Sequence, residues 1–343
     1  MPSRFRPLRP ALPPVVLVLV FGAFALCVPN YLSAVNLRQL MRDLAEPGLV
    51  TLGMAVAVLA GGIDLSVGAT FATADLAALF AFQIEGLPAS VACAAALLSG
   101  ALIGAANGLL VAYAGAGPFL TTLATLLVVR AGYNAAANAL TAQLADAGGS
   151  SAAWDLVGTG TVLGIPVSTV VLAAAAGAVH LFLTRVRAGL HVVAVGSSRR
   201  AARHAGIDVR FTLLLAYVLC ACCAALAGFL YAARQGSAGS DAGLGMEMTA
   251  LAALAVGGGG LAGGRGTVAQ ALTGAATMVL LVGGFLRLNL PGSLTSAVTG
   301  LALLAAVALD ARWRLARRRV PVAGEDGGRR AAGPAPRLAP RPE

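Results

Sequence analysis

The stretch Gly61-Gly62-Ile63-Asp64-Leu65-Ser66-Val67-Gly68 places a carboxylate and a hydroxyl between glycines, where one long apolar run gives way to the next. Polar groups at membrane depth are tolerated only where they are buried in protein or line a watery cavity. A carboxylate in such a place is a functional-site hypothesis by default. The stretch therefore predicts a site inside a membrane-spanning protein, with Asp64 at its centre.

The composition is that of a membrane protein. Hydrophobic residues make up 58% of the chain and charged residues 11%, with a mean hydropathy of +0.84, whereas soluble domains carry about 25% charged residues. The sequence predicts an all-α polytopic protein of about ten transmembrane helices, with its membrane domain at residues 12–310. The predicted spans are residues 12–28, 44–60, 65–82, 88–113, 118–137, 165–183, 211–233, 248–261, 267–286 and 293–309.

The net charge of +10 comes from clustered arginines, and the chain contains no lysine. Clustered basic loops stay on the cytoplasmic side of a membrane. Both termini and the central loop at residues 185–210 are then predicted to be cytoplasmic, with six spans before that loop and four after it. Arg38 and Arg42 count against this arrangement, because they fall in the first external segment. The distribution favours topology and contact with membrane lipid over a nucleic-acid partner.

Two terminal segments fall outside the predicted membrane domain. Residues 1–11 form a short cytoplasmic N-terminus. Residues 311–343 are rich in Arg, Pro, Gly and Ala, a composition that cannot bury a core. We expect this basic cytoplasmic tail to be disordered.

The sequence predicts no catalytic, cofactor or metal site. The glycine-rich run at residues 259–267 superficially resembles a phosphate-binding loop, but such a loop needs a lysine to reach the terminal phosphates. The three histidines have neither zinc-site nor triad spacing, and the five cysteines lie in apolar spans, where a free cysteine behaves as a small hydrophobe. The chain is therefore expected not to be an enzyme, and any ATP hydrolysis must occur on a separate subunit.

The central loop contains a short helix by its capping signals. Ser197 or Ser198 can cap it, residues 199–205 can form about two turns, and Gly206 is placed to end it in the left-handed conformation. A flat alanine face is formed by Ala201, Ala202 and Ala205. Such a helix can dock into a groove of another protein or lie on anionic lipid, and the sequence leaves both open.

The sequence leaves the role of three further features open. The glycine clusters at residues 61–69 and 256–267 form a weak internal echo, as expected of a transporter built from a pseudo-repeat, although glycine is abundant throughout. The external segment at residues 140–164 is either a docking surface for an external partner or a simple loop. Asp75, within the third span, is either a hydrogen-bonded structural carboxylate or a pore residue.

Taken together, these motifs resemble the ribose/xylose-type permeases of bacterial ABC importers. Residues 61–68 look like the first signature, and residues 118–125, followed by Arg130 and Gly132, look like the second. Residues 187–207 resemble the family's cytoplasmic coupling segment, and the match continues in order through residues 228–267 to Asp310. The resemblance implies a multi-pass inner-membrane permease of about ten helices. It further implies a second permease copy, two ATP-binding subunits and an extracytoplasmic solute-binding protein as partners.

The resemblance also implies roles for individual residues. The expected solute is a small polar molecule, and a monosaccharide is favoured. The pore or gate residues are Gly61, Gly62, Asp64, Ser66, Gly68, Asn107, Phe119 and Thr122, and the ATPase-coupling residues are Gly196, Arg199, Arg200, Ala201, Ala202, Ala205 and Gly206. Arg199-Arg200 and Gly259-Gly260 depart from the residues common in that family, which leaves the identity of the solute open.

The sequence leaves two alternative functions open. A nucleoside or branched-chain amino acid ABC permease would share the glycine-rich spans and differ in cargo. A proton-coupled secondary transporter would need no ATPase, and would use Asp64, Asp75 and Glu247 as a relay. The coupling-type helix argues against the second alternative.

Overall fold

The computed structural model describes residues 12–147, 149–260 and 263–288, with single positions at 291, 294, 297, 300, 301 and 304. The predicted N-terminal segment 1–11 and the tail 311–343 lie outside the described residues, as does nearly all of the predicted last span at 293–309. The described part of the chain is helical except for one short hairpin and the connecting turns.

The helices follow the apolar runs of the sequence. They are α1 (Leu12–Cys27), α2 (Ala34–Leu59), α3 (Val67–Leu79), the π-helical turn η1 (Phe80–Ile84), α4 (Ala89–Ala112), α5 (Pro118–Ala147), α6 (Ala152–Gly158), α7 (Val167–Arg185), α8 (Arg187–Ser197), α9 (Arg199–His204), α10 (Val209–Gln235), α11 (Met246–Val256) and α12 (Val268–Arg287). The strands β1 (Thr161–Val162) and β2 (Ile165–Pro166) pair antiparallel between α6 and α7.

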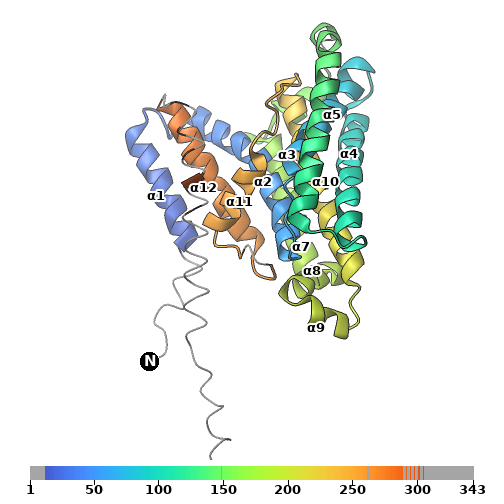
Figure 1. Ribbon diagram of the computed structural model, residues 1–343. Helices are drawn as coiled ribbons and strands as arrows, with labels where there is room; N and C mark the ends of the chain where they lie inside the picture. The colour runs from blue at the N-terminus through green and yellow to red at the C-terminus, as the bar shows by residue number, and fades with distance from the viewer. Residues whose placement is uncertain are drawn as a thin grey trace, which may run out of the picture.

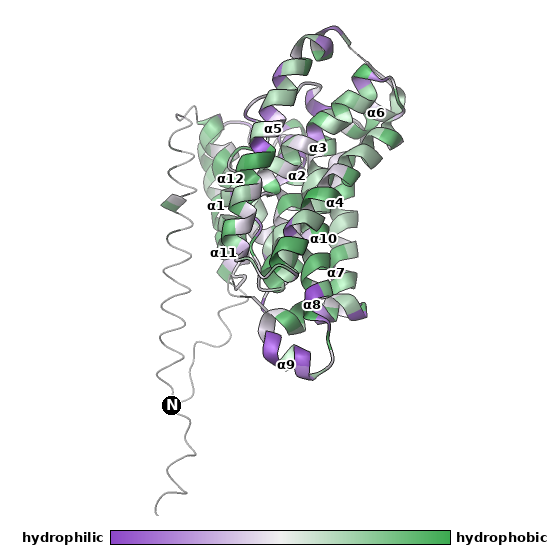
Figure 2. Cartoon of the chain, turned by 45° about the vertical axis from the view of Figure 1, so that its right-hand side comes forward, coloured by the Kyte–Doolittle hydropathy of each residue, from purple (hydrophilic) through white to green (hydrophobic). Residues whose placement is uncertain are grey.

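Six helical segments in the described residues are long and apolar enough to cross a membrane: α3 with η1, α4, α5, α7, α10 and α12. Each of the first nine predicted spans contains a helix, but α1 and α11 are shorter apolar helices and α2 carries several charged residues. The multi-pass helical architecture is therefore present, and the number ten remains a prediction. Figure 2 shows apolar helix surfaces in the middle of the molecule, with polar residues gathered at the α9 end and near the opposite end.

Helix α10 lies at the centre of the fold and packs against α2, α3 and α4 (Figure 1). Three glycines at four-residue spacing in α4, Gly100, Gly104 and Gly108, make one of these contacts possible. A Cβ on Gly104 would stand 2.7 Å from the Tyr217 carbonyl oxygen, and a Cβ on Gly108 would stand 2.9 Å from the Leu214 Cα. Small residues let neighbouring helix backbones approach this closely, which is the role that their four-residue spacing predicts.

The outer segment at residues 140–164, for which the sequence left a docking surface and a simple loop open, contains helix and a short hairpin. Helix α5 continues to Ala147, because the Leu, Ala and Gln residues after position 139 favour helix over turn. The rest of the segment folds onto the helix ends: Trp154 is buried and stacks on Phe82 with ring centroids 4.0 Å apart. Arg42, expected in a loop, lies in α2 and donates from Nη2 to the Thr159 carbonyl at 2.6 Å.

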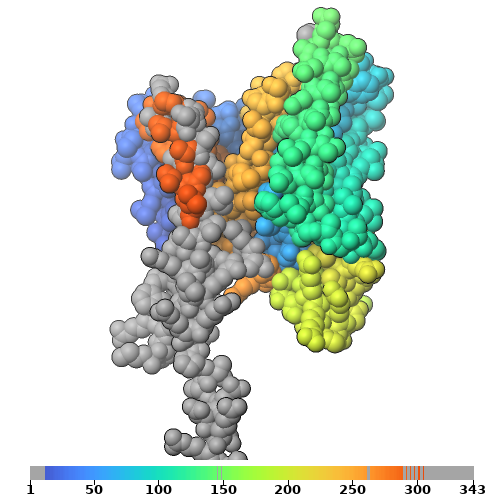
Figure 3. All heavy atoms as spheres, viewed as in Figure 1, coloured from blue at the N-terminus to red at the C-terminus, as the bar shows by residue number. Residues whose placement is uncertain are grey.

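The central basic segment forms α8 and α9 at the end of the molecule away from α6 (Figure 2), and Figure 3 shows it as a yellow-green projection. Ser198 caps α9 by accepting from the Ala201 backbone N–H at 3.2 Å, and Gly206 follows the helix at φ +78°. Both features are those predicted from the sequence. The preceding helix α8 was not predicted.

Candidate functional site

The predicted site forms a tight turn between α2 and α3. Gly61 adopts φ +80°, a conformation that residues with a side chain rarely take, and it follows the end of α2. Gly62 lies against the side chain of Tyr217 in α10, whose hydroxyl oxygen would stand 2.5 Å from a Cβ at that position. The two glycines therefore allow the chain to reverse in close contact with α10.

Asp64 is the acceptor at the centre of a buried hydrogen-bond network. Its Oδ1 accepts from the Ser66 backbone N–H at 2.9 Å, from Ser66 Oγ at 2.6 Å and from Asn107 Nδ2 at 3.4 Å. Asn107 Nδ2 also donates to Ser66 Oγ at 2.8 Å, and Thr125 Oγ1 donates to Asn107 Oδ1 at 2.7 Å. These four side chains, here called the Asp64 network, join the α2–α3 turn to α4 and α5.

Two further hydroxyl groups hold the same turn. Thr122 Oγ1 and the Tyr217 hydroxyl both donate to the Ile63 carbonyl, at 3.3 and 3.4 Å. Thr125 and Tyr217 were not predicted as site residues. Thr125 lies three residues after Thr122 on one helix face, a signal that the sequence contained. The contact of Tyr217 with residue 63 depends on tertiary packing, which no local pattern predicts.

The structure brings six of the eight predicted pore or gate residues together. Gly61, Gly62, Asp64, Ser66, Asn107 and Thr122 surround the α2–α3 turn, and the polar side chains among them have no exposed surface. Gly68 faces a different neighbour, the Glu247 carboxylate of α11. Phe119 is 55% exposed on α5 and does not join the network.

The predicted coupling residues lie at the junction of α8 with α9 and along α9. Arg199, Arg200, Ala201, Ala205 and Gly206 are exposed, whereas Ala202 is buried against the rest of the chain. The predicted alanine face is therefore divided, because α9 turns Ala202 inward. Ala201 and Ala205 remain available to a partner.

A cluster of close-packed backbone connects this junction to the α2–α3 turn. Gly196 lies so close to the Leu59 carbonyl oxygen that a Cβ would overlap it, and a Cβ on Gly263 would stand 3.0 Å from the Gly61 Cα. The Gly264 backbone N–H donates to the Leu59 carbonyl at 3.0 Å. Arg199 Nη2 donates to the Gly61 carbonyl at 3.2 Å. We call Gly61, Gly196, Gly263 and Gly264 the glycine junction.

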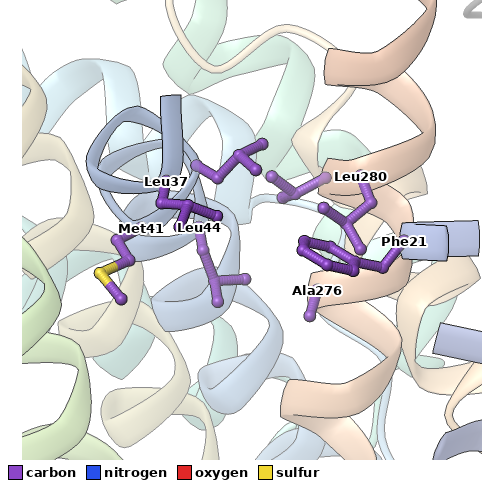
Figure 4. A pocket seen from close by; sticks show the side chains of 8 residues that line it. Phe21, Leu37, Met41, Leu44, Ala276 and Leu280 are labelled. Atoms are coloured by element: carbon purple, nitrogen blue, oxygen red, sulfur yellow. The ribbon is translucent and has the colours of Figure 1, made fainter. Parts of the chain in front are cut away.

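The chemistry available at these positions is hydrogen bonding and packing. In the described ranges, no group of three or more His, Cys, Asp or Glu residues could hold a metal ion. A cavity of about 210 Å³ lies between α1, α2 and α12 (Figure 4). It is lined by Phe21, Leu37, Leu40, Met41, Leu44, Ala276, Val279 and Leu280. These walls offer no side-chain hydrogen bond to a polar solute.

Comparison with known proteins identifies the family of this chain. Residues 36–307 match the family described as branched-chain amino acid transport system / permease component. The ribose import permease protein of Escherichia coli strain K12 is 32% identical over 299 residues, covering 86% of this chain and 92% of the relative. The D-allose transport system permease protein of the same strain is 31% identical, covering 86% and 88%. The galactofuranose transporter permease protein of that strain is 32% identical, covering 84% and 86%. No solved structure matches the chain.

Proposed function

Because this chain belongs to the branched-chain amino acid transport system / permease component family, we propose that it is the membrane-spanning subunit of an ATP-driven importer that passes a monosaccharide into the cell. The observation that carries the proposal is 32% identity to a ribose import permease across 86% of the chain. The family description names amino acids, but the similar permeases are named for ribose, D-allose and galactofuranose. Their names favour a sugar over the amino acid and nucleoside alternatives.

The proposal places ATP hydrolysis and solute capture on other subunits. The chain lacks lysine and so cannot form a phosphate-binding loop of the usual kind. We assign it a second permease copy, two ATP-binding subunits and an extracytoplasmic solute-binding protein as partners. In the inner membrane, ten spans would place both termini and the α8–α9 segment in the cytoplasm, in agreement with the arginine clusters.

We assign the Asp64 network to the gate and not to the pore wall. Its central polar side chains are fully buried and bond to one another, so they offer little to a passing solute. Their bonds fix the α2–α3 turn to α4 and α5. The exposed face of α9, with Arg199, Ala201 and Ala205, is assigned to docking of the ATPase. A displacement of α9 would reach the turn directly through the glycine junction.

The test is reconstitution of the permease in proteoliposomes with its ATPase and solute-binding protein. Uptake of radiolabelled D-ribose, D-allose and D-galactose is measured with ATP or with a non-hydrolysable analogue on the side of the ATPase. We expect ATP-dependent uptake of at least one sugar, and none without the ATPase. Uptake of leucine or a nucleoside in place of any sugar would contradict the proposed cargo. Uptake driven by a proton gradient without ATPase would contradict the class.

A further inference from the structure

The segment between α10 and α11 is non-helical and packs deep against α3. Residues 236–245 form turns and bends beside α3 (Figure 1). Gln83 Nε2 at the end of η1 donates to the Gly236 carbonyl at 3.1 Å. Further along, Gly243 lies against Gly68 near the start of α3, so closely that a Cβ on either glycine would overlap the other's carbonyl oxygen. The segment therefore runs beside α3 for most of its length. Non-helical backbone at membrane depth lies where it is buried in protein or lines a cavity.

A polar stripe on α5 covers the same segment. Arg130, Tyr133 and Asn134 follow the i, i+3, i+4 spacing that places residues on one helix face. Arg130 Nη1 donates to the Ala242 carbonyl, and the Tyr133 hydroxyl donates to the Gly239 carbonyl at 2.6 Å. The segment is thus held between α3 and α5.

Unpartnered polar atoms gather around this segment. Nine buried side-chain nitrogen or oxygen atoms in the described residues lack a hydrogen-bond partner. Six belong here: both carboxylate oxygens of Asp75, Gln83 Oε1, Arg130 Nε, Asn134 Oδ1 and Glu247 Oε2. We call Asp75, Gln83, Arg130, Tyr133, Asn134 and Glu247 the polar seam. Buried polar groups normally have hydrogen-bond partners, so a concentration of unpartnered ones is typical of a place that receives water, an ion or a ligand.

Asp75 is the most completely buried of these unpartnered groups. It has no exposed surface, and it lies on α3 one turn after Phe71, whose ring packs against Tyr231 of α10 at 5.2 Å and contacts Gly243. Neither oxygen of its carboxylate has a hydrogen-bond donor in the described residues. By contrast, Glu46 is also buried, but Arg234 donates to both of its oxygens at 3.0 and 2.7 Å. The fold thus pairs the buried carboxylate of Glu46 with an arginine, and leaves that of Asp75 without a hydrogen-bond donor in the described residues.

We infer that the polar seam is the solute-contacting wall of the translocation path, and that it binds the hydroxyl groups of a neutral polyhydroxylated solute. This inference rests on the proposed function and names the contacting residues. Asp75 and Asn134 would accept hydrogen bonds from solute hydroxyls, and Arg130 Nε would donate to a solute oxygen. The seam is closed in this conformation, so residues 236–245 must move for a solute to enter. Gly243 and Gly245 adopt positive φ, a conformation that residues with a side chain rarely take, so the path of this segment depends on glycine at both positions.

The experiment measures whether the seam opens. Asp75→Cys is placed in the full complex with ATPase and solute-binding protein, and is treated with a small cationic methanethiosulfonate in nucleotide-free and ATP-trapped states. Mass spectrometry reads the labelling peptide by peptide, so the five native cysteines can stay. The matched control is Ala74→Cys, a neighbouring buried position that packs against Gly228 of α10. We expect the thiol introduced at position 75 to react about tenfold faster than the thiol introduced at position 74 in one of the two states, because thiol labelling requires access.

A second readout tests contact with the solute. Loss of a hydrogen bond to the solute predicts about a tenfold fall in D-ribose uptake for Asp75→Leu, and a smaller fall for Asp75→Asn, which keeps the shape. If the thiol of the Asp75→Cys variant is as unreactive as that of the Ala74→Cys control in every state, the inference is overturned. If the wild-type complex takes up no sugar but the thiol introduced at position 75 still becomes reactive, the assigned solute is wrong and the seam remains the wall of the path, because thiol labelling does not depend on the solute.

Discussion

At the scale of single residues, Asp64 and Asp75 are both fully buried carboxylates in different surroundings. Oδ1 of Asp64 accepts three hydrogen bonds within the chain, whereas neither oxygen of Asp75 accepts any in the described structure. The sequence predicted Asp64 as a site because glycines flank it, and left Asp75 as either a hydrogen-bonded structural carboxylate or a pore residue. Only the tertiary arrangement of α3, α5 and residues 236–245 separates a bonded carboxylate from a free one.

Truncation of Asp64 should weaken the fold as well as transport. Asp64→Ala removes the acceptor of Ser66 Oγ and Asn107 Nδ2 and leaves these buried donors without it, at a cost of about 1–3 kcal/mol. Asp64→Asn keeps an acceptor oxygen and is expected to unfold near the wild-type temperature. Its weaker, uncharged hydrogen bonds should still lower uptake. Thermal unfolding of the purified variants in detergent, together with uptake in proteoliposomes, measures both effects. An Asp64→Ala protein as stable as wild type would show that the network does not hold the turn.

At the scale of elements, the sequence predicted the helix boundaries that depend on capping residues close to the helix end. Ser198 and Gly206 flank α9 in the structure, as the sequence predicted, because a capping residue and a left-handed residue act within one helical turn. The end of α5 was placed too early, since a few polar residues do not stop a helix when their helix propensity is high. The glycine junction was not predicted at all. Its hydrogen bond from Arg199 to Gly61 joins residues 138 positions apart.

The glycine junction should tolerate no added side chain at Gly196. In Gly196→Ala the new methyl group would overlap the Leu59 carbonyl oxygen, so α8 must move away from the α2–α3 turn. Overpacking of this kind costs about 1–3 kcal/mol, and we expect uptake and stimulated ATP hydrolysis to fall together. Gly177→Ala in α7 is the matched control, because no heavy atom lies within 4 Å of the added Cβ. Equal transport by the two variants would remove the junction from the coupling route.

The alanines at positions 202 and 205 should respond differently to bulk. Ala205 is exposed, so Ala205→Trp should leave thermal stability unchanged while abolishing copurification with the ATPase and uptake in cells. Ala202 is buried, so Ala202→Trp should lower the melting temperature of the permease itself, through overpacking of about 1–3 kcal/mol. If α9 instead lies on lipid, tryptophan at position 205 strengthens membrane binding and leaves the complex intact. Copurification of the Ala205→Trp variant distinguishes the two roles.

At the scale of the whole molecule, composition and charge predicted a multi-pass helical membrane protein, because these properties depend on sums over the chain. The arrangement of the helices about α10 depends on small residues meeting across helices, such as Gly104 with Ala221. A stripe of small residues in the sequence indicates that a helix packs closely, but it does not name the partner. The family match supplies the class of transporter, and the contacts of the polar seam supply a place where the solute can be recognised.

The absence of lysine from this chain predicts that ATP is hydrolysed only on a separate subunit. Nucleotide-binding loops of the usual kind need a lysine to reach the terminal phosphates, and this chain contains none. The permease purified alone in nanodiscs is therefore expected to release no phosphate from ATP above the level of empty nanodiscs. Addition of the ATPase subunit should give hydrolysis that rises further with the solute-loaded binding protein, and the ATPase subunit without permease serves as the control. The increase should be lost in Gly196→Ala and kept in Gly177→Ala, because the first separates the coupling segment from the gate and the second adds a methyl group that meets no heavy atom within 4 Å. Turnover by the permease alone that persists through further purification would contradict the assignment of this chain as a transport subunit.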